Sequence, residues 1–124
     1  EFIKKARRIR KVFGGGMRQA GYLAAAGIYA LKNNINRLKQ DQEHARQIAE
    51  AIMQKDFVDN LLPVETNIII FQLKPGCTAQ KLVAKLKEHN ILVHPISSNQ
   101  IRLVTHLDIT PQMVDKTIDS IKKL

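Results

Sequence analysis

The chain has 124 residues, which is enough for one domain or for a domain with an appended segment. With 44% hydrophobic and 25% charged residues, its composition is that of an ordinary folded protein, and no apolar run approaches the roughly 20 residues that a membrane-spanning helix needs. The net charge of +9 is concentrated near the start, because residues 1–20 hold seven basic residues and one acidic residue, a net of +6.

Residues 2–12 are predicted to form a helix with Phe2, Ile3 and Ile9 on one face and the basic residues on the other. The triglycine Gly14–Gly16 ends it, and an alanine-rich helix is expected from about residue 17 to 31. A glycine loop that enters a helix offers free N–H groups and a positive dipole end to an anion. The alternative is a linker between two helices that needs a tight backbone.

A long amphipathic helix is predicted from about Asn36 to Gln54. Its expected buried stripe consists of Leu38, Ala45, Ile48 and Ile52, whereas Glu43 and His44 are expected to face water. The change from an alanine- and glycine-rich helix to an amphipathic one places a domain boundary at residues 32–35.

The remainder alternates between strand and helix patterns. Residues 67–73 form a buried β run, and Thr78 is the expected N-cap of a helix that ends at Asn90. Residues 91–93 and 100–106 are predicted strands joined by a turn, and Thr110-Pro111 begins a last helix. We therefore expect an α/β fold of the α+β kind: a long helix, then β-α-β-β-α with a small antiparallel sheet and helices on one face.

Three strings of residues resemble the low-specificity L-threonine aldolases, which are pyridoxal-phosphate enzymes of the aspartate-aminotransferase fold type (fold type I). The first is RRIRKVFGGGMRQAG at residues 7–21, continued by LAAAG at 23–27 and YAL at 29–31. The second is IRLVTHLD at 101–108, and the third is ETNI at 65–68. They occur in the order found in the family, and the resemblance covers essentially the whole chain.

The resemblance implies the C-terminal portion of such an aldolase. Residues 1–33 would be the helical tail of the large pyridoxal-phosphate domain, including the GGGMRQ loop, and residues 34–124 the C-terminal small domain. The activity implied is cleavage of L-threonine or L-allo-threonine to glycine and acetaldehyde, in a cytoplasmic homodimer or homotetramer. The lysine that forms the Schiff base would lie upstream of Glu1, so the chain would hold no catalytic residue and would be inactive alone.

Arg102 is the strongest candidate for binding substrate. It interrupts an apolar strand, and a guanidinium can hold a carboxylate through two parallel charge-assisted hydrogen bonds. By resemblance, this position binds the α-carboxylate of the amino-acid substrate. The alternative is an arginine on a solvated sheet face.

Lys11 and Arg18 lie on either side of the three glycines. The resemblance places both at the active site near the cofactor phosphate, with Arg18 and Lys11 as cofactor-binding residues and Lys11 also as a substrate-binding residue. From the pattern alone, Lys11 could equally be a solvated lysine in a basic helix.

Other chemistry finds little support in the sequence. The four histidines have no metal-binding spacing, and Cys77, the only cysteine, is interpreted as an incidental thiol, so we expect no metal site. His106 is expected to be structural. Two alternative functions stay open: another fold type I lyase acting on a different amino acid, and a basic nucleic-acid-binding module centred on residues 4–18. We expect no nucleic-acid partner, because aromatic residues are not interleaved with the basic ones. We also expect no membrane partner, because no apolar run is long enough to cross a bilayer.

Overall fold

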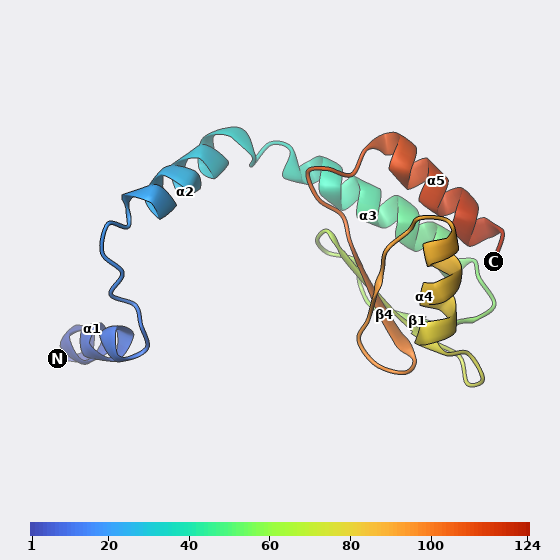
Figure 1. Ribbon diagram of the computed structural model, residues 1–124, viewed down its shortest axis with the longest axis horizontal. Coiled ribbons are helices and arrows are strands. Elements are labelled where there is room, and N and C mark those ends of the chain that lie inside the picture. Colours follow the sequence, from blue (N-terminus) through green and yellow to red (C-terminus); the bar gives the residue numbers. More distant parts are fainter. The chain divides into compact units, whose positions relative to one another are not determined.

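The computed structural model describes residues 1–124 and comprises two compact units, residues 1–36 and residues 37–124 (Figure 1). The first unit contains helices α1 (Phe2–Val12) and α2 (Gly21–Asn33). Neither helix buries a residue, and apolar side chains such as Phe13 and Tyr22 are more than four-fifths exposed. This unit therefore has no hydrophobic core of its own. No helix of the chain is both long and apolar enough to cross a bilayer.

Helix α1 ends in a Schellman motif built on the triglycine. Gly14 has a φ of +84°, and its N–H donates to the carbonyl oxygen of Lys11, while the N–H of Gly15 donates to the carbonyl oxygen of Arg10 at 2.7 Å. A Cβ at Gly15 would lie 2.5 Å from Cγ of Arg10, so only glycine fits there. The first two glycines thus serve as a helix stop.

Helix α2 begins at Gly21, four residues later than predicted. Residues 17–20 are not helical, and Gln19 has a φ of +48°. The expectation that the glycines open directly onto a helix N-terminus is therefore wrong, because two of their three N–H groups are bonded to α1 and the dipole end lies beyond Ala20. The linker alternative describes the local backbone.

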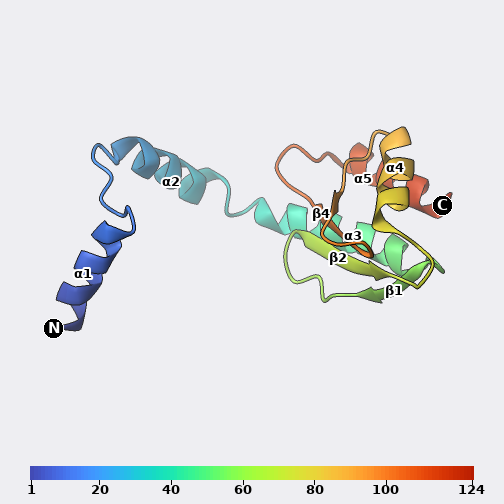
Figure 2. The same cartoon turned by 60° about the horizontal axis from the view of Figure 1, so that its bottom comes forward.

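The second unit is a four-stranded antiparallel sheet with three helices. In chain order its elements are α3 (Leu38–Met53), β1 (Val58–Leu61), β2 (Ile68–Leu73), α4 (Ala79–Glu88), β3 (His94–Pro95), β4 (Gln100–Val104) and α5 (Pro111–Lys122). The strand order is β1-β2-β4-β3, and every neighbouring pair is antiparallel. Figure 2 shows β1, β2 and β4 with the three helices around them.

The helices cover one face of this sheet. Alternate strand residues Ile69, Phe71 and Leu73 of β2, and Ile101 and Leu103 of β4, are at most 8% exposed and join one core cluster with the helices. Since strand side chains alternate between faces, all three helices lie on the same side. Helix α5 lies along α3 (Figure 1). The predicted small antiparallel sheet with helices on one face is confirmed.

Two helix caps were predicted and are present. The hydroxyl of Thr78 accepts a hydrogen bond from the amide of Lys81, and that of Thr110 accepts one from the amide of Met113, with Pro111 opening α5. These bonds satisfy amide groups that a helix N-terminus would otherwise leave without partners.

The strand prediction differs from the structure at two places. Strand β1 was not predicted, because its sequence VDNL has two polar central residues and its pairing with β2 is interrupted by a bulge between Val58 and Asn60. The short third strand is residues 94–95 and not 91–93. Asn90, with a φ of +60°, ends α4 in a second Schellman motif, in which the amide of Ile91 donates to the carbonyl oxygen of Leu86.

Helix α3 buries a stripe that starts one turn later than expected. Leu38 is 47% exposed, and the first buried position is Asp41. His44, expected to face water, is 5% exposed. The reason is a polar contact with the sheet: Thr105, directly after β4, donates its hydroxyl to the backbone carbonyl oxygen of Asp41 at 2.6 Å and so holds this turn of α3 against the end of β4.

Candidate functional site

Arg102 lies on the open face of the sheet. Its strand neighbours Ile101 and Leu103 point into the core, so Arg102 and Val104 face away from the helices. In the register of the sheet, Arg102 is opposite Ile70 of β2 on one side and opposite His94 of β3 on the other. The guanidinium is exposed and forms no ion pair within the chain. It is thus available to an external anion.

A shallow hollow of about 340 Å³ surrounds this guanidinium. Leu92, Val93 and Val104 contribute apolar surface, and Arg102, His94 and His106 contribute polar groups. No acidic side chain lines the hollow, so its electrostatic character favours an anion with a small apolar body. His94 was not singled out from the sequence, because the strand predicted to precede the turn ended at Val93, one residue before β3 begins.

The strand that carries Arg102 is fixed at its end by a cluster of hydrogen bonds. Besides the bond from Thr105 to Asp41, the side-chain amide of Asn67 donates to the carbonyl oxygen of Thr105 at 2.6 Å. The amide N–H of Thr105 in turn donates to the carbonyl oxygen of Asn67 at 3.0 Å. The residue strings ETNI and IRLVTHLD, which are far apart in sequence, therefore meet here. We call these three residues the β4 clasp, because they hold the end of β4 against β2 and α3.

The burial of two polar residues of α3, Asp41 in the clasp and His44 one turn later, was not anticipated. Asp41, whose side chain is 5% exposed, forms an ion pair with Arg37, the N-cap residue of α3. His44 is buried, and its Nδ1 has no hydrogen-bond partner. The spacing of residues 41, 44, 45 and 48 places them on one face of α3 and could have indicated that Asp41 and His44 are buried with Ala45 and Ile48. It was missed because acids and histidines are usually placed on the exposed face.

His106 follows the clasp and takes part in a local turn. Its Nδ1 accepts a hydrogen bond from the amide of Asp108 at 3.3 Å and lies 3.6 Å from the Asp108 carboxylate. The side chain is half exposed and also borders the hollow around Arg102. The imidazole of His106 thus takes part in a local turn and also borders the hollow around Arg102.

Lys11 and Arg18 belong to the first unit, on either side of the glycine turn. Lys11 is exposed in the last turn of α1, and its stem lies over Gly16, where a Cβ would be 3.5 Å from Cδ of Lys11. Arg18 is exposed in the segment between α1 and α2. Neither forms an ion pair, since the only pair in this unit joins Lys5 and Glu1. The structure thus brings two free cations to the glycine turn, while Arg102 lies in the other unit.

Comparison with known proteins places these features in a family. Residues 1–75 match the family described as Beta-eliminating lyase. The chain is 42% identical over 120 residues to low-specificity L-threonine aldolase 1 of Arabidopsis thaliana, which covers 94% of this chain and 34% of that protein. It is 40% identical over 114 residues to the low specificity L-threonine aldolase of Escherichia coli (strain K12), which covers 92% of this chain and 33% of that protein.

The fold is also found among solved structures. The ornithine delta-aminotransferase of Plasmodium falciparum matches with a TM-score of 0.61 and 19% identity, over 77% of this chain and 26% of that one. The resemblance to an aminotransferase fold is therefore confirmed at the level of structure. The chain spans about a third of the length of the curated relatives that it matches. Because the match spans more than half of its residues, the chain belongs to the family described as Beta-eliminating lyase.

Proposed function

We propose that the chain supplies part of a pyridoxal-phosphate-dependent threonine aldolase, which cleaves L-threonine or L-allo-threonine to glycine and acetaldehyde. The similarity to two proteins named as threonine aldolases supports the reaction. The observation that carries the proposal for this chain is Arg102, an unpaired guanidinium in an apolar strand, exposed on the open face of the sheet.

Arg102 binds the α-carboxylate of the amino-acid substrate in this proposal. A guanidinium forms two parallel charge-assisted hydrogen bonds with a carboxylate, which fix the orientation of the substrate as well as its charge. The β4 clasp keeps the strand in place, so that the guanidinium does not have to be positioned anew at each turnover.

Lys11 and Arg18 hold the phosphate of the cofactor. The residues at the glycine turn suit a phosphate dianion, because two cations stand free of acidic partners and the N–H of Gly16 donates to no group of the chain. The amides of Gly14 and Gly15 are not available for this role, since they cap α1. Lys11 also contributes to substrate binding. When bound, pyridoxal phosphate serves as an electron sink for cleavage of the Cα–Cβ bond of the substrate.

Self-association and a cytoplasmic location complete the proposal. Helices α1 and α2 expose apolar side chains along their whole length, including Phe2, Leu23 and Tyr29. Such a surface is normally covered by other protein. In the proposed enzyme it packs against further parts of the same polypeptide and against a second subunit, in a homodimer or homotetramer.

The activity is tested by measuring acetaldehyde and glycine released from L-threonine and L-allo-threonine by the full-length protein loaded with pyridoxal phosphate. Release of both products in equal amounts supports the proposal. The second candidate is a lyase of the same fold that eliminates a β-substituent from another amino acid, and the family match favours it. Production of a keto acid and ammonia from such substrates, without acetaldehyde from threonine, would establish that candidate instead.

A nucleic-acid-binding module centred on residues 4–18 is a separate alternative. Its charge lies on α1, whose basic residues are exposed. Binding to duplex or single-stranded nucleic acid with a steep dependence on salt would favour it. We expect no such binding, because the segment contributes charge but no aromatic residues on which bases could stack.

A further inference from the structure

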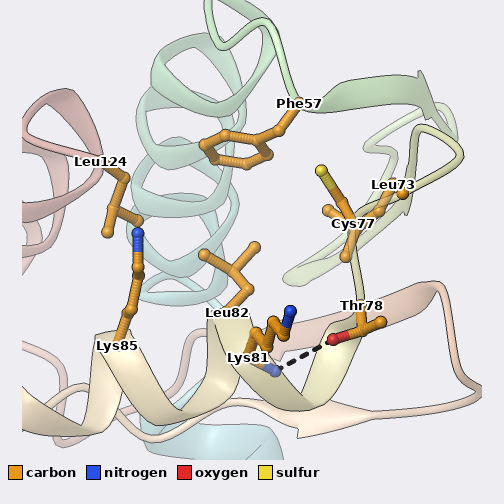
Figure 3. A pocket seen from close by; sticks show the side chains of 9 residues that line it. Phe57, Leu73, Cys77, Thr78, Lys81, Leu82, Lys85 and Leu124 are labelled. Carbon is orange, nitrogen blue, oxygen red and sulfur yellow. Dashed lines mark hydrogen bonds between the residues drawn. The ribbon is translucent and has the colours of Figure 1, made fainter.

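A second hollow lies on the helix-covered side of the sheet, at the start of α4 (Figure 3). It has a volume of about 190 Å³. Phe57, Leu73, Leu82 and Leu124 form its apolar wall, and Leu73 and Leu82 are at most 9% exposed. Its rim consists of Cys77, Lys81 and Lys85, all of which are exposed to solvent. The hollow is therefore apolar inside and polar at its mouth.

The charged side chains at this mouth are of one sign. Lys81 and Lys85 are the only residues with charged side chains that line the hollow, and they lie one helical turn apart on the same side of α4. Neither side chain forms an ion pair or a hydrogen bond within the chain. The hydroxyl of Thr78 is already used, because it accepts the amide of Lys81. The two ammonium groups are thus the free polar groups at the mouth.

The volume sets the size of the ligand. A cavity of about 150 Å³ with apolar walls is enough to bind benzene. The hollow at α4 is larger by roughly the volume of a short side chain and opens toward two cations. We propose that it binds a monocyclic aromatic carboxylate, with the ring against Phe57 and Leu82 and the carboxylate at Lys81 and Lys85.

This site is separate from the one around Arg102. Leu73, which lines the hollow at α4, is a core-facing residue of β2, whereas the side chain of Arg102 faces away from the helices. The two hollows share no lining residue. The proposal is therefore independent of the proposed aldolase function, and either can fail without the other.

Titration of the full chain with 3-phenylpropionate, followed by ¹H–¹⁵N NMR, tests the site. The matched probe is 3-phenylpropanamide, which has the same ring and length but no charge. A ligand of this size is expected to bind with a dissociation constant of about 1 mM. We expect the amide signals of Gly76, Cys77 and Leu82 to shift, and the acid to bind more tightly than the amide. Bound acid should also slow alkylation of the Cys77 thiol.

Variants of the two lysines distinguish the contribution of their charge to binding from that of the apolar cavity. Lys81→Gln and Lys85→Gln should each weaken binding of the acid about two- to five-fold, as expected for an exposed ion pair, and leave binding of the amide unchanged. Lys87→Gln is the control, because Lys87 is an exposed lysine of α4 that does not line the hollow. All three changes are at exposed positions, so the spectrum of the folded chain should be preserved.

Several outcomes would overturn the proposal. They are equal affinity for acid and amide, an effect of Lys87→Gln as large as that of Lys81→Gln, shifts centred on Arg102 in place of Leu82, or the absence of a saturable shift well above the expected dissociation constant.

Discussion

The hydroxyl of Thr105 provides a sharp test of how the strand carrying Arg102 is held. Thr105 is 2% exposed, and its Oγ1 donates to the carbonyl oxygen of Asp41 at 2.6 Å. Thr105→Val keeps the shape of the side chain but removes the donor. A net hydrogen bond is worth about 0.5–1.5 kcal/mol, and burying a methyl group against a carbonyl oxygen adds to the loss, so we expect the free energy of unfolding to fall by about 1–2 kcal/mol.

Urea denaturation of the full chain, followed by circular dichroism, measures this loss. All buried residues lie in the unit of residues 37–124, so the cooperative transition reports on that unit. With a urea dependence of about 1–1.5 kcal/mol/M for a unit of this size, the midpoint should fall by about 1 M. Thr105→Ser, which keeps the hydroxyl, should lower the free energy of unfolding by less than Thr105→Val does.

Thr117→Val is the matched control. The hydroxyl of Thr117 also donates to a backbone carbonyl, that of Met113 at 2.8 Å, but it does so on the exposed side of α5. Its removal should change the free energy of unfolding by less than about 0.5 kcal/mol. The reasoning about the β4 clasp would be refuted if both valine variants shifted the midpoint equally.

Three further changes test other parts of the account. Gly15→Ala would place a Cβ 2.5 Å from Cγ of Arg10, so we expect it to break the hydrogen bonds from the Gly14 and Gly15 amides to α1 and to speed the hydrogen exchange of α1 at its end. Gly16→Ala, with its nearest atom at 3.5 Å, should not have this effect, and equal exchange rates in both variants would argue against the Schellman motif. In urea denaturation, Phe71→Ala should lower the free energy of unfolding by about 3–5 kcal/mol, because Phe71 is 2% exposed, whereas Ile68→Ala on the open face should lower it by less than about 1 kcal/mol. Comparable losses in the two variants would contradict the assignment of the two sheet faces. In the full-length protein, Arg18→Ala should weaken pyridoxal-phosphate binding by a factor of about ten or more in an equilibrium titration. The control variant Arg46→Ala, on the exposed side of α3, should leave the affinity unchanged. An unchanged affinity of Arg18→Ala would show that Arg18 does not bind the phosphate.

Most elements of the second unit could be predicted because their signals are local. The alternation around Phe71, the threonine caps and the stripe of α5 each depend on residues close in sequence. Strand β1 could not be predicted in this way, since its residues VDNL form a strand only through pairing with β2. The left-handed conformation of Asn90, which ends α4 before Ile91, was likewise a property of the helix terminus that apolar patterning does not report.

In the candidate site too, features set by local sequence could be predicted, and features set by contacts between distant residues could not. The position of Arg102 on a sheet face followed from alternation within one strand. The burial of Asp41 and His44 did not, because this turn of α3 lies against residues far away in the sequence, such as Thr105, whose hydroxyl donates to the carbonyl oxygen of Asp41 64 positions earlier. The glycine turn was misread for a different reason: glycines after a basic helix suit an anion-binding loop and a helix C-cap equally well, and only the hydrogen bonds of Gly14 and Gly15 distinguish the two.

The most direct test of the account is the specificity of Arg102 for the substrate carboxylate. In the full-length protein, we expect Arg102→Lys to lower kcat/KM for L-threonine by a factor of about 10–100, because lysine keeps the charge but loses the paired hydrogen bonds. Pyridoxal-phosphate affinity should stay unchanged, and Arg46→Lys on α3 should leave all constants near those of the unaltered protein. A kcat/KM of Arg102→Lys equal to that of Arg46→Lys would contradict the central claim.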